Sequence, residues 1–163
     1  MSVSRRLLVI PTMVFYNDDG NRLVEAFRKQ YLMENEVVAG IAHNKGNYLV
    51  GRKFEPVRNI EVWEFPGGKI EKGESVEEAA RREWLEELSV ELVGFGGVIC
   101  TLENEIHRIH FCAVEIRDMP RAIEHLELSW KTPEELALLS MHSLDAEFVR
   151  QYLINYSGGF ARR

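Results

Sequence analysis

Short apolar runs bounded by turn residues fill the middle of the chain, a pattern typical of strands. Residues 37–42 (VVAGIA) and 47–51 (NYLVG) are predicted to be strands joined by a turn at Asn44-Lys45-Gly46. Further strands are predicted at 62–65, 92–101 and 107–116. The first of these runs into the turn formed by Pro66, Gly67 and Gly68, since proline and glycine mark the end of a strand.

The first 36 residues are less regular, and their pattern leaves two possibilities open. Residues 7–16 and 22–27 are prone to form strands, and the turn residues Asn17-Asp18-Asp19-Gly20 lie between them. Residues 21–33 also carry apolar side chains at helical spacing. The sequence does not decide between a strand and a helix there.

Helix starts are marked by side chains that cap the first turn. Ser75 followed by Glu78 has the spacing of a capping box, which predicts a helix beginning near Val76. Thr132-Pro133-Glu134-Glu135 predicts a second helix in the same way, with proline at its first position. A third helix is expected after Ser143. Together these elements predict a mixed α/β domain.

Composition narrows the class of protein. The 163 residues are 45% hydrophobic and 28% charged, which fits one ordinary globular domain. The net charge of -6 argues against a broad surface for a nucleic-acid polymer. No apolar run is long enough for a membrane span, and residues 1–16 lack a signal-peptide cleavage pattern, so we expect a cytoplasmic protein. Cys100 and Cys112 are expected to be buried thiols, with a disulfide as the alternative.

An acidic cluster on the first predicted helix carries the strongest chemical signal. Glu83, Glu86 and Glu87 are spaced i, i+3 and i+4, so their carboxylates share one face of the helix and repel one another. Hard divalent cations such as Mg²⁺ bind oxygen ligands of this kind. A solvated helix face laced with ion pairs explains Arg81 and part of Arg82, but it does not explain Glu83 beside Glu87.

Residues 68–90 (GKIEKGESVEEAARREWLEELSV) resemble the Nudix box, G-x5-E-x7-R-E-U-x-E-E-x-G-U, where U is a bulky apolar residue. The positions that match are Gly68, Glu74, Arg82, Glu83, Glu86, Glu87 and Val90. Trp84 stands where an aliphatic residue is usual, and Ser89 replaces a glycine that would favour the left-handed C-cap conformation. The resemblance implies an α/β/α sandwich with a mixed sheet over residues 37–163, and an N-terminal extension of unknown role over residues 1–36.

The resemblance also implies roles for individual residues. The metal ligands would be Gly68, through its carbonyl, and the carboxylates of Glu83, Glu86, Glu87 and Glu124, holding Mg²⁺ or Mn²⁺. Glu124 is one candidate in the segment before Trp130, and Glu127 is the competing one. Either Glu83 or Glu124 would be the general base, and Arg82 would orient the carboxylates.

Outside the box, the chain is similar to the MutT-like branch of the family. That similarity implies that a basic residue near the end of the second strand touches the substrate phosphates, and Arg52 or Lys53 occupies this place, with Lys53 the closer match. It also implies that Asp145, near the start of the last helix, reads the edge of the base. A helix-capping role for Asp145 is the structural alternative.

The reaction implied is metal-dependent hydrolysis of a nucleoside diphosphate linked to a second group. A (d)NTP is the expected substrate, with a nucleoside monophosphate and pyrophosphate as products. ADP-ribose or a nucleotide sugar is the alternative substrate, and a nucleotide-binding module without catalysis is the alternative of another class. We expect a monomer or homodimer with no membrane partner.

Overall fold

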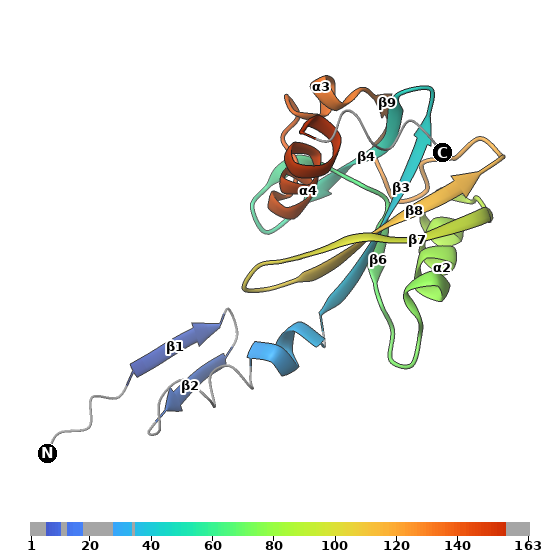
Figure 1. Ribbon diagram of the computed structural model, residues 1–163. Helices are drawn as coiled ribbons and strands as arrows, with labels where there is room; N and C mark the ends of the chain where they lie inside the picture. The colour runs from blue at the N-terminus through green and yellow to red at the C-terminus, as the bar shows by residue number, and fades with distance from the viewer. Residues whose placement is uncertain (1–5, 11–12, 18–27, 34, 156–163) are drawn as a thin grey trace, which may run out of the picture.

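A mixed sheet of seven strands forms the centre of the fold (Figure 1). The computed structural model describes residues 6–10, 13–17, 28–33 and 35–155. Five strands lie in the order β5–β4–β3–β8–β7, and β6 and β9 pair with β3 and β4 respectively. Only the β3–β8 pair is parallel; the other pairs are antiparallel. The strands are β3 (Glu36–Asn44), β4 (Asn47–Glu55), β5 (Ile60–Glu64), β6 (Gly67–Lys69), β7 (Leu92–Glu103), β8 (Arg108–Ile116) and β9 (Glu127–Lys131).

The predicted turn between β3 and β4 is confirmed, with Lys45 and Gly46 both at positive φ. The two strands pair only beside this turn, where His43 lies opposite Tyr48 and Asn44 opposite Asn47. Beyond the turn, β3 pairs with β6 and β8, and β4 pairs with β5 and β9. The sequence pattern did not predict β6 or β9, because each is short and becomes recognisable only through its pairing.

The capping boxes begin two helices where the sequence places them. Helix α2 (Val76–Leu88) is capped by Ser75, and α3 (Pro133–Leu136) is capped by Thr132. At the end of α2, Ser89 adopts the left-handed conformation, with φ 54° and ψ 37°. A serine therefore fills the C-cap position of a glycine, at a conformational cost of about 1 kcal/mol.

The third helix begins at Ser143 and changes its hydrogen-bonding pattern halfway. The α-helical part, α4, spans Ser143–Phe148, and a π-helical turn, η1, continues over Val149–Ile154. Its buried side chains pack on the face of the sheet opposite α2 (Figure 1). The predicted α/β fold with helices on both faces of a mixed sheet is confirmed.

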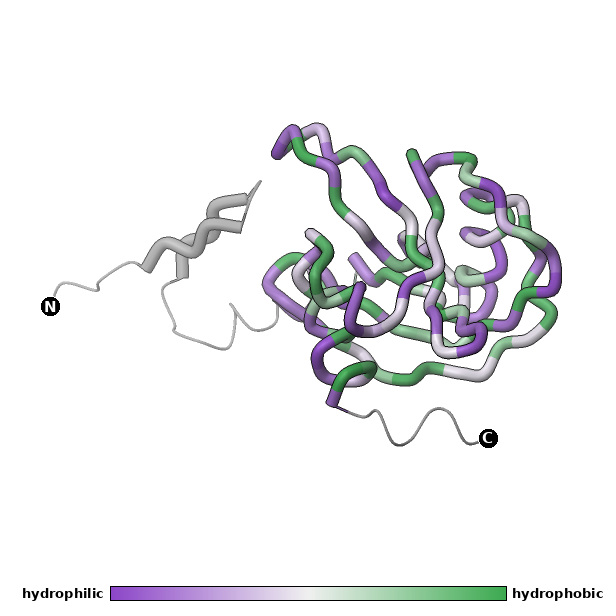
Figure 2. Tube along the Cα trace, turned by 90° about the horizontal axis from the view of Figure 1, so that it is seen from above, coloured by the Kyte–Doolittle hydropathy of each residue, from purple (hydrophilic) through white to green (hydrophobic). Residues whose placement is uncertain are grey.

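Each face of the sheet has its own apolar core. Trp84 and Leu88 of α2 pack with Val38 and Val114 on one face, and Phe148 of α4 packs on the other. Both cysteines are free thiols, as expected; Cys112 is buried in the first cluster, whereas Cys100 is only half-buried against the second. Apolar and polar segments alternate along the chain (Figure 2). None of the described helices has the length and apolar character of a membrane-spanning segment.

The unusual Trp84 of the box is accommodated by a glycine on β3. Its indole is completely buried. A Cβ atom on Gly40 would come within 2.1 Å of the indole Nε1. The box can therefore carry an aromatic residue at this position, because Gly40 has no side chain that would occupy the same space.

In the N-terminal part, the prediction of one strand over residues 7–16 is wrong. Two strands, β1 (Arg6–Ile10) and β2 (Met13–Asn17), pair with each other in a separate antiparallel sheet. Residues 28–33 form a helix, so the helical alternative for residues 21–33 is confirmed over its last six residues. The predicted strand at 22–27 and most of the predicted turn at 17–20 lie outside the described residues.

Candidate active site

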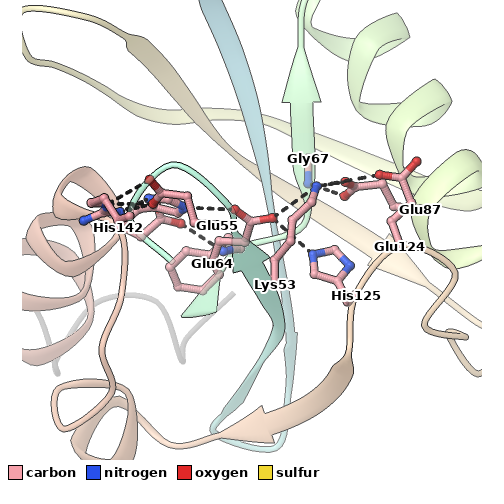
Figure 3. Close-up of polar contacts among 11 residues, drawn as sticks. Lys53, Glu55, Glu64, Gly67, Glu87, Glu124, His125 and His142 are labelled. Atoms are coloured by element: carbon pink, nitrogen blue, oxygen red, sulfur yellow. Dashed lines mark hydrogen bonds and ion pairs between the residues drawn. The ribbon is translucent and has the colours of Figure 1, made fainter. Parts of the chain in front are cut away.

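The ammonium group of Lys53 lies among three carboxylates that come from three different parts of the chain (Figure 3). Its Nζ atom is 3.2 Å from Glu87 Oε1, 3.6 Å from Glu124 Oε2 and 3.8 Å from Glu64 Oε1. Burial by itself would lower the pKa of Lys53, but the three carboxylates raise it overall. Lys53 is therefore a protonated cation at neutral pH.

Glu64, at the end of β5, connects this cluster to two histidines. Its Oε1 lies 3.3 Å from His125 Nε2, and its Oε2 lies 3.3 Å from His142 Nε2. Burial would raise the pKa of Glu64, but the hydrogen bonds from both imidazoles and the charge of Lys53 outweigh it and bring the pKa to about 2. Glu64 is a carboxylate throughout the physiological range.

The His125 ring is buried because β4 leaves room for it. A Cβ atom on Gly51 would lie within 2.2 Å of the imidazole. While Nε2 faces Glu64, the buried Nδ1 has no hydrogen-bond partner among the described residues. The imidazole is consequently held between the β4 backbone and the acidic cluster.

Glu87 is the most buried carboxylate of the cluster, with 3% of its surface exposed. One oxygen faces Lys53, and the other accepts a hydrogen bond of 3.2 Å from the Gly67 backbone N–H. Burial nevertheless raises the pKa of Glu87 above its usual value, and the charge of Lys53 offsets only part of this. A buried carboxylate of this kind is stabilised by any further cation that reaches it.

A second group on the same helix is organised by Arg82. Its guanidinium binds Glu74 through two nitrogens at 2.8 Å, and it also donates to Glu83 Oε1 at 2.7 Å and to the Lys69 carbonyl at 2.9 Å. Glu86 lies 3.4 Å from the same guanidinium. The hydrogen bonds to Glu74 and Glu83 raise the pKa of Arg82 further. Arg82 thus contacts three carboxylates of the box, those of Glu74, Glu83 and Glu86.

Gly68 fits this arrangement because it has no side chain. A Cβ atom there would come within 2.4 Å of the Glu83 carboxylate. The carboxylate therefore lies directly against the β6 backbone. Its position depends on Gly68 from one side and on Arg82 from the other.

The structure separates the two basic candidates of β4. Arg52 forms ion pairs with Glu61 and, at 3.0 Å, with Glu127, and it lies over the ring of Trp63. Neighbouring residues of a strand face opposite sides, so Arg52 points away when Lys53 enters the cluster. The same geometry places Glu124 in the cluster and Glu127 outside it.

Asp145 lines a pocket of about 270 Å³ that Glu64 of the cluster also lines. It is buried, and its Oδ1 accepts a hydrogen bond of 2.9 Å from the Phe65 backbone N–H. Desolvation raises the pKa of Asp145 to about 7. The helix-capping alternative is wrong, because His142 occupies the N-cap position. The other walls include His107 and Asn104 from the β7–β8 turn and His142.

The donor set fits a divalent cation. Glu64, Glu87 and His125 each offer a ligand atom, and these atoms lie within 4.8 Å of one another. Carboxylate oxygens suit hard cations, and the buried, incompletely compensated Glu87 favours an added positive charge. Of the predicted ligands, Glu87 belongs to this set and Glu124 to the cluster around Lys53, while Gly68, Glu83 and Glu86 belong to the neighbouring group around Arg82.

Sequence reasoning missed Glu64, His125 and His142 as members of the site. The sequence around Glu64 is typical of an ordinary strand. A carboxylate between two aromatic residues, Trp63 and Phe65, is the local feature that could have indicated a role in the site. His125 follows Glu124 directly in a segment already singled out. Neither position reveals its partner, because the contacts join residues about sixty positions apart.

Comparisons with known proteins agree with the fold and with the family that the box indicates. A family model described as the NUDIX domain matches residues 33–152. The chain therefore belongs to the Nudix family, as its box predicted. The CTP pyrophosphohydrolase of Escherichia coli K12 is 31% identical over 123 residues, which cover 72% of this chain and 90% of that protein. The nucleoside triphosphatase NudI of Salmonella agona is 30% identical over 129 residues, covering 68% and 91%.

A further relative and a solved structure show the same likeness. The putative 8-oxo-dGTP diphosphatase 2 of Mycobacterium tuberculosis H37Rv is 32% identical over 114 residues, covering 64% of this chain and 78% of that protein. The solution structure of the Escherichia coli ORF135 protein is similar with a TM-score of 0.63 and 29% identity, covering 77% of this chain and 93% of that one.

Proposed function

We propose that the protein hydrolyses a (d)NTP to the nucleoside monophosphate and pyrophosphate in a reaction that requires Mg²⁺ or Mn²⁺. The observation that carries the proposal is the cluster of Glu64, Glu87 and Glu124 around Lys53, beside a Nudix box whose charged positions are all present. The names of the relatives, a CTP pyrophosphohydrolase and a nucleoside triphosphatase, favour triphosphates over ADP-ribose or nucleotide sugars.

The carboxylates around Lys53 and Arg82 would hold the divalent cation. Bound there, the cation would neutralise charge on the phosphate oxygens and favour deprotonation of water. The residues proposed to hold it are Glu87, Glu64 and Glu124 with His125, next to the predicted ligands Gly68, Glu83 and Glu86. Arg82 and Glu74 would keep Glu83 in place.

We place the general base at Glu124, with Glu83 as the alternative. The Glu83 carboxylate accepts a hydrogen bond from Arg82 at 2.7 Å and is largely buried. The Glu124 side chain is 53% exposed, and its ion pair with Lys53 is longer, at 3.6 Å. Because the Glu124 carboxylate is more exposed and less tightly bound than that of Glu83, it is better placed to take a proton from an attacking water.

Lys53 and Asp145 are proposed to bind opposite ends of the nucleotide. The Lys53 ammonium would bind the phosphates, and the pocket at Asp145 would receive the base. With its pKa raised to about 7, Asp145 is present both as an acceptor and as a donor near neutral pH. Either form hydrogen-bonds to the polar edge of a base.

The experiment that tests the proposal measures pyrophosphate and phosphate release from a panel of (d)NTPs, ADP-ribose and nucleotide sugars with Mg²⁺. Pyrophosphate release from one or a few (d)NTPs is expected, and Glu87→Gln should abolish it without unfolding the protein. Glu77→Gln is the matched control, because Glu77 lies on the same helix but pairs with Arg81, outside the site. Turnover of ADP-ribose alone would overturn the proposed substrate. Nucleotide binding without turnover would favour a binding module.

A further inference from the structure

Lys53 contacts the oxygen atoms that a divalent cation would need as ligands. Its Nζ lies 3.2 Å from Glu87 Oε1 and 3.8 Å from Glu64 Oε1, and both residues belong to the set whose ligand atoms converge within 4.8 Å. In Figure 3 the side chain extends from β4 and ends between Glu64 on one side and Glu87 and Glu124 on the other. The lysine is thus a cation within the proposed metal-binding group.

The Lys53 ammonium and a bound divalent cation would repel each other and compete for the same oxygen atom. Positive charges a few ångströms apart repel, and they do so more strongly in a partly buried site than in water. Glu87 has one oxygen facing Lys53 and the other bound to the Gly67 N–H, so its first oxygen cannot serve both cations fully. The ammonium group is also on a long, flexible side chain that can change its position.

We propose that Lys53 is an internal competitor of the divalent cation: its ammonium neutralises Glu87 and Glu64, and metal binding moves it towards the substrate phosphates. The inference rests on the proposed function and deepens it, because it links metal binding to phosphate binding through one side chain. Metal and lysine exchange places on the carboxylates, and the displaced ammonium becomes available to an anionic substrate. Lys53 therefore sets the metal affinity of the site.

A purely structural role for Lys53 predicts a different change in metal affinity when the lysine is removed. If Lys53 only holds Glu87 and Glu64 in place, its removal disorganises the ligands and weakens metal binding. If Lys53 competes with the metal, its removal strengthens metal binding although the protein without metal becomes less stable. The sign of the change in metal affinity therefore separates the two roles.

The test is Mn²⁺ binding without nucleotide, measured from the electron paramagnetic resonance signal of free Mn²⁺. Lys53→Met is expected to lower the Kd for Mn²⁺ by about tenfold, the scale expected for removing one nearby like charge. Lys53→Arg keeps the charge and should stay within about threefold of the wild type. Lys131→Met is the matched control, because it removes one lysine charge from β9, where Lys131 pairs with Glu135 outside the cluster.

A second measurement guards against a folding defect. Mn²⁺ should raise the Tm of Lys53→Met by more degrees than that of the wild type, and Lys53→Gln should behave in the same way. An unchanged or higher Kd in both neutral variants would overturn the inference. A wild-type protein that binds no Mn²⁺ would instead contradict the proposed function, so the two failures are distinguishable.

Discussion

The backbone of Gly68 lies directly against the carboxylate of Glu83, with no room for a Cβ atom between them. The atoms that the new Cβ would meet form the far end of the Glu83 side chain, so Gly68→Ala is expected to displace this carboxylate from Arg82 rather than to unfold the protein. Activity should fall more than tenfold, towards that of Glu83→Gln, while the free energy of unfolding changes by less than about 1 kcal/mol. Steady-state kinetics and denaturant unfolding check this. A large loss of stability would show that Gly68 serves the fold instead.

Gly40 and Trp84 make a second prediction, on stability. Gly40→Ala overpacks the core against a rigid indole and should cost about 2 kcal/mol. Trp84→Leu restores an aliphatic residue to the box but leaves a cavity, at a cost of about 3 kcal/mol. Because the new methyl group enters that cavity, the double variant should be more stable than the sum of the single effects predicts, by about 1 kcal/mol. Urea unfolding of all four proteins measures this, and strict additivity would contradict it.

The raised pKa of Asp145 predicts how stability depends on pH. The pKa is about 7 in the folded protein and 3.8 ordinarily, so between these values the folded state keeps a proton that the unfolded state has lost. The contribution of Asp145 to stability therefore declines as the pH rises from about 4 to about 7. Asp145→Asn can still accept the hydrogen bond from the Phe65 N–H and should remove this decline.

The difference between the two proteins removes most of the contribution of other titrating groups. The lowered pKa of Glu64 contributes stability that is lost as the pH falls through about 2. The raised pKa of His142 contributes stability that is lost as the pH rises above its ordinary value of 6.5 and through the folded value. Both contributions remain in Asp145→Asn, where the pKa of His142 loses only the smaller effect of the Asp145 charge beside that of Glu64. Its Tm relative to wild type should therefore increase from pH 5 to pH 8, and a constant difference would refute the assignment.

His107 is expected to influence how the substrate binds. It lines the pocket with Asp145, and its backbone is held by Asn104, whose Oδ1 accepts a hydrogen bond of 2.9 Å from the His107 N–H. His107→Ala should raise KM for the preferred (d)NTP by about tenfold with little change in kcat, because contact with a flat base is worth about 1–3 kcal/mol. Glu105→Ala, in the same turn but outside the pocket lining, is the control. A fall in kcat alone would place His107 in another role.

Features that depend on neighbouring residues were predictable from the sequence. The capping boxes at Ser75 and Thr132, the turn at Lys45-Gly46 and the box on α2 all have short-range causes, such as a side-chain oxygen within reach of a backbone N–H. The N-terminal hairpin was missed although a local signal is present. Pro11 interrupts the apolar run over residues 7–16, between the two segments that pair as β1 and β2.

The same distinction between short-range and long-range causes applies to the residues of the candidate site. By itself, the sequence determined the family and the acidic face of α2, because helical periodicity and the box fix which side chains share a face. Only the tertiary structure shows that Lys53 and Glu124 lie in the cluster while Arg52 and Glu127 pair with each other outside it, because this depends on which face of β4 meets α2 and on the pairing of β4 with β9. It also brought Glu64 and His125 to Glu87. Strand alternation shows that two neighbours point in opposite directions, but packing determines which of them enters the site.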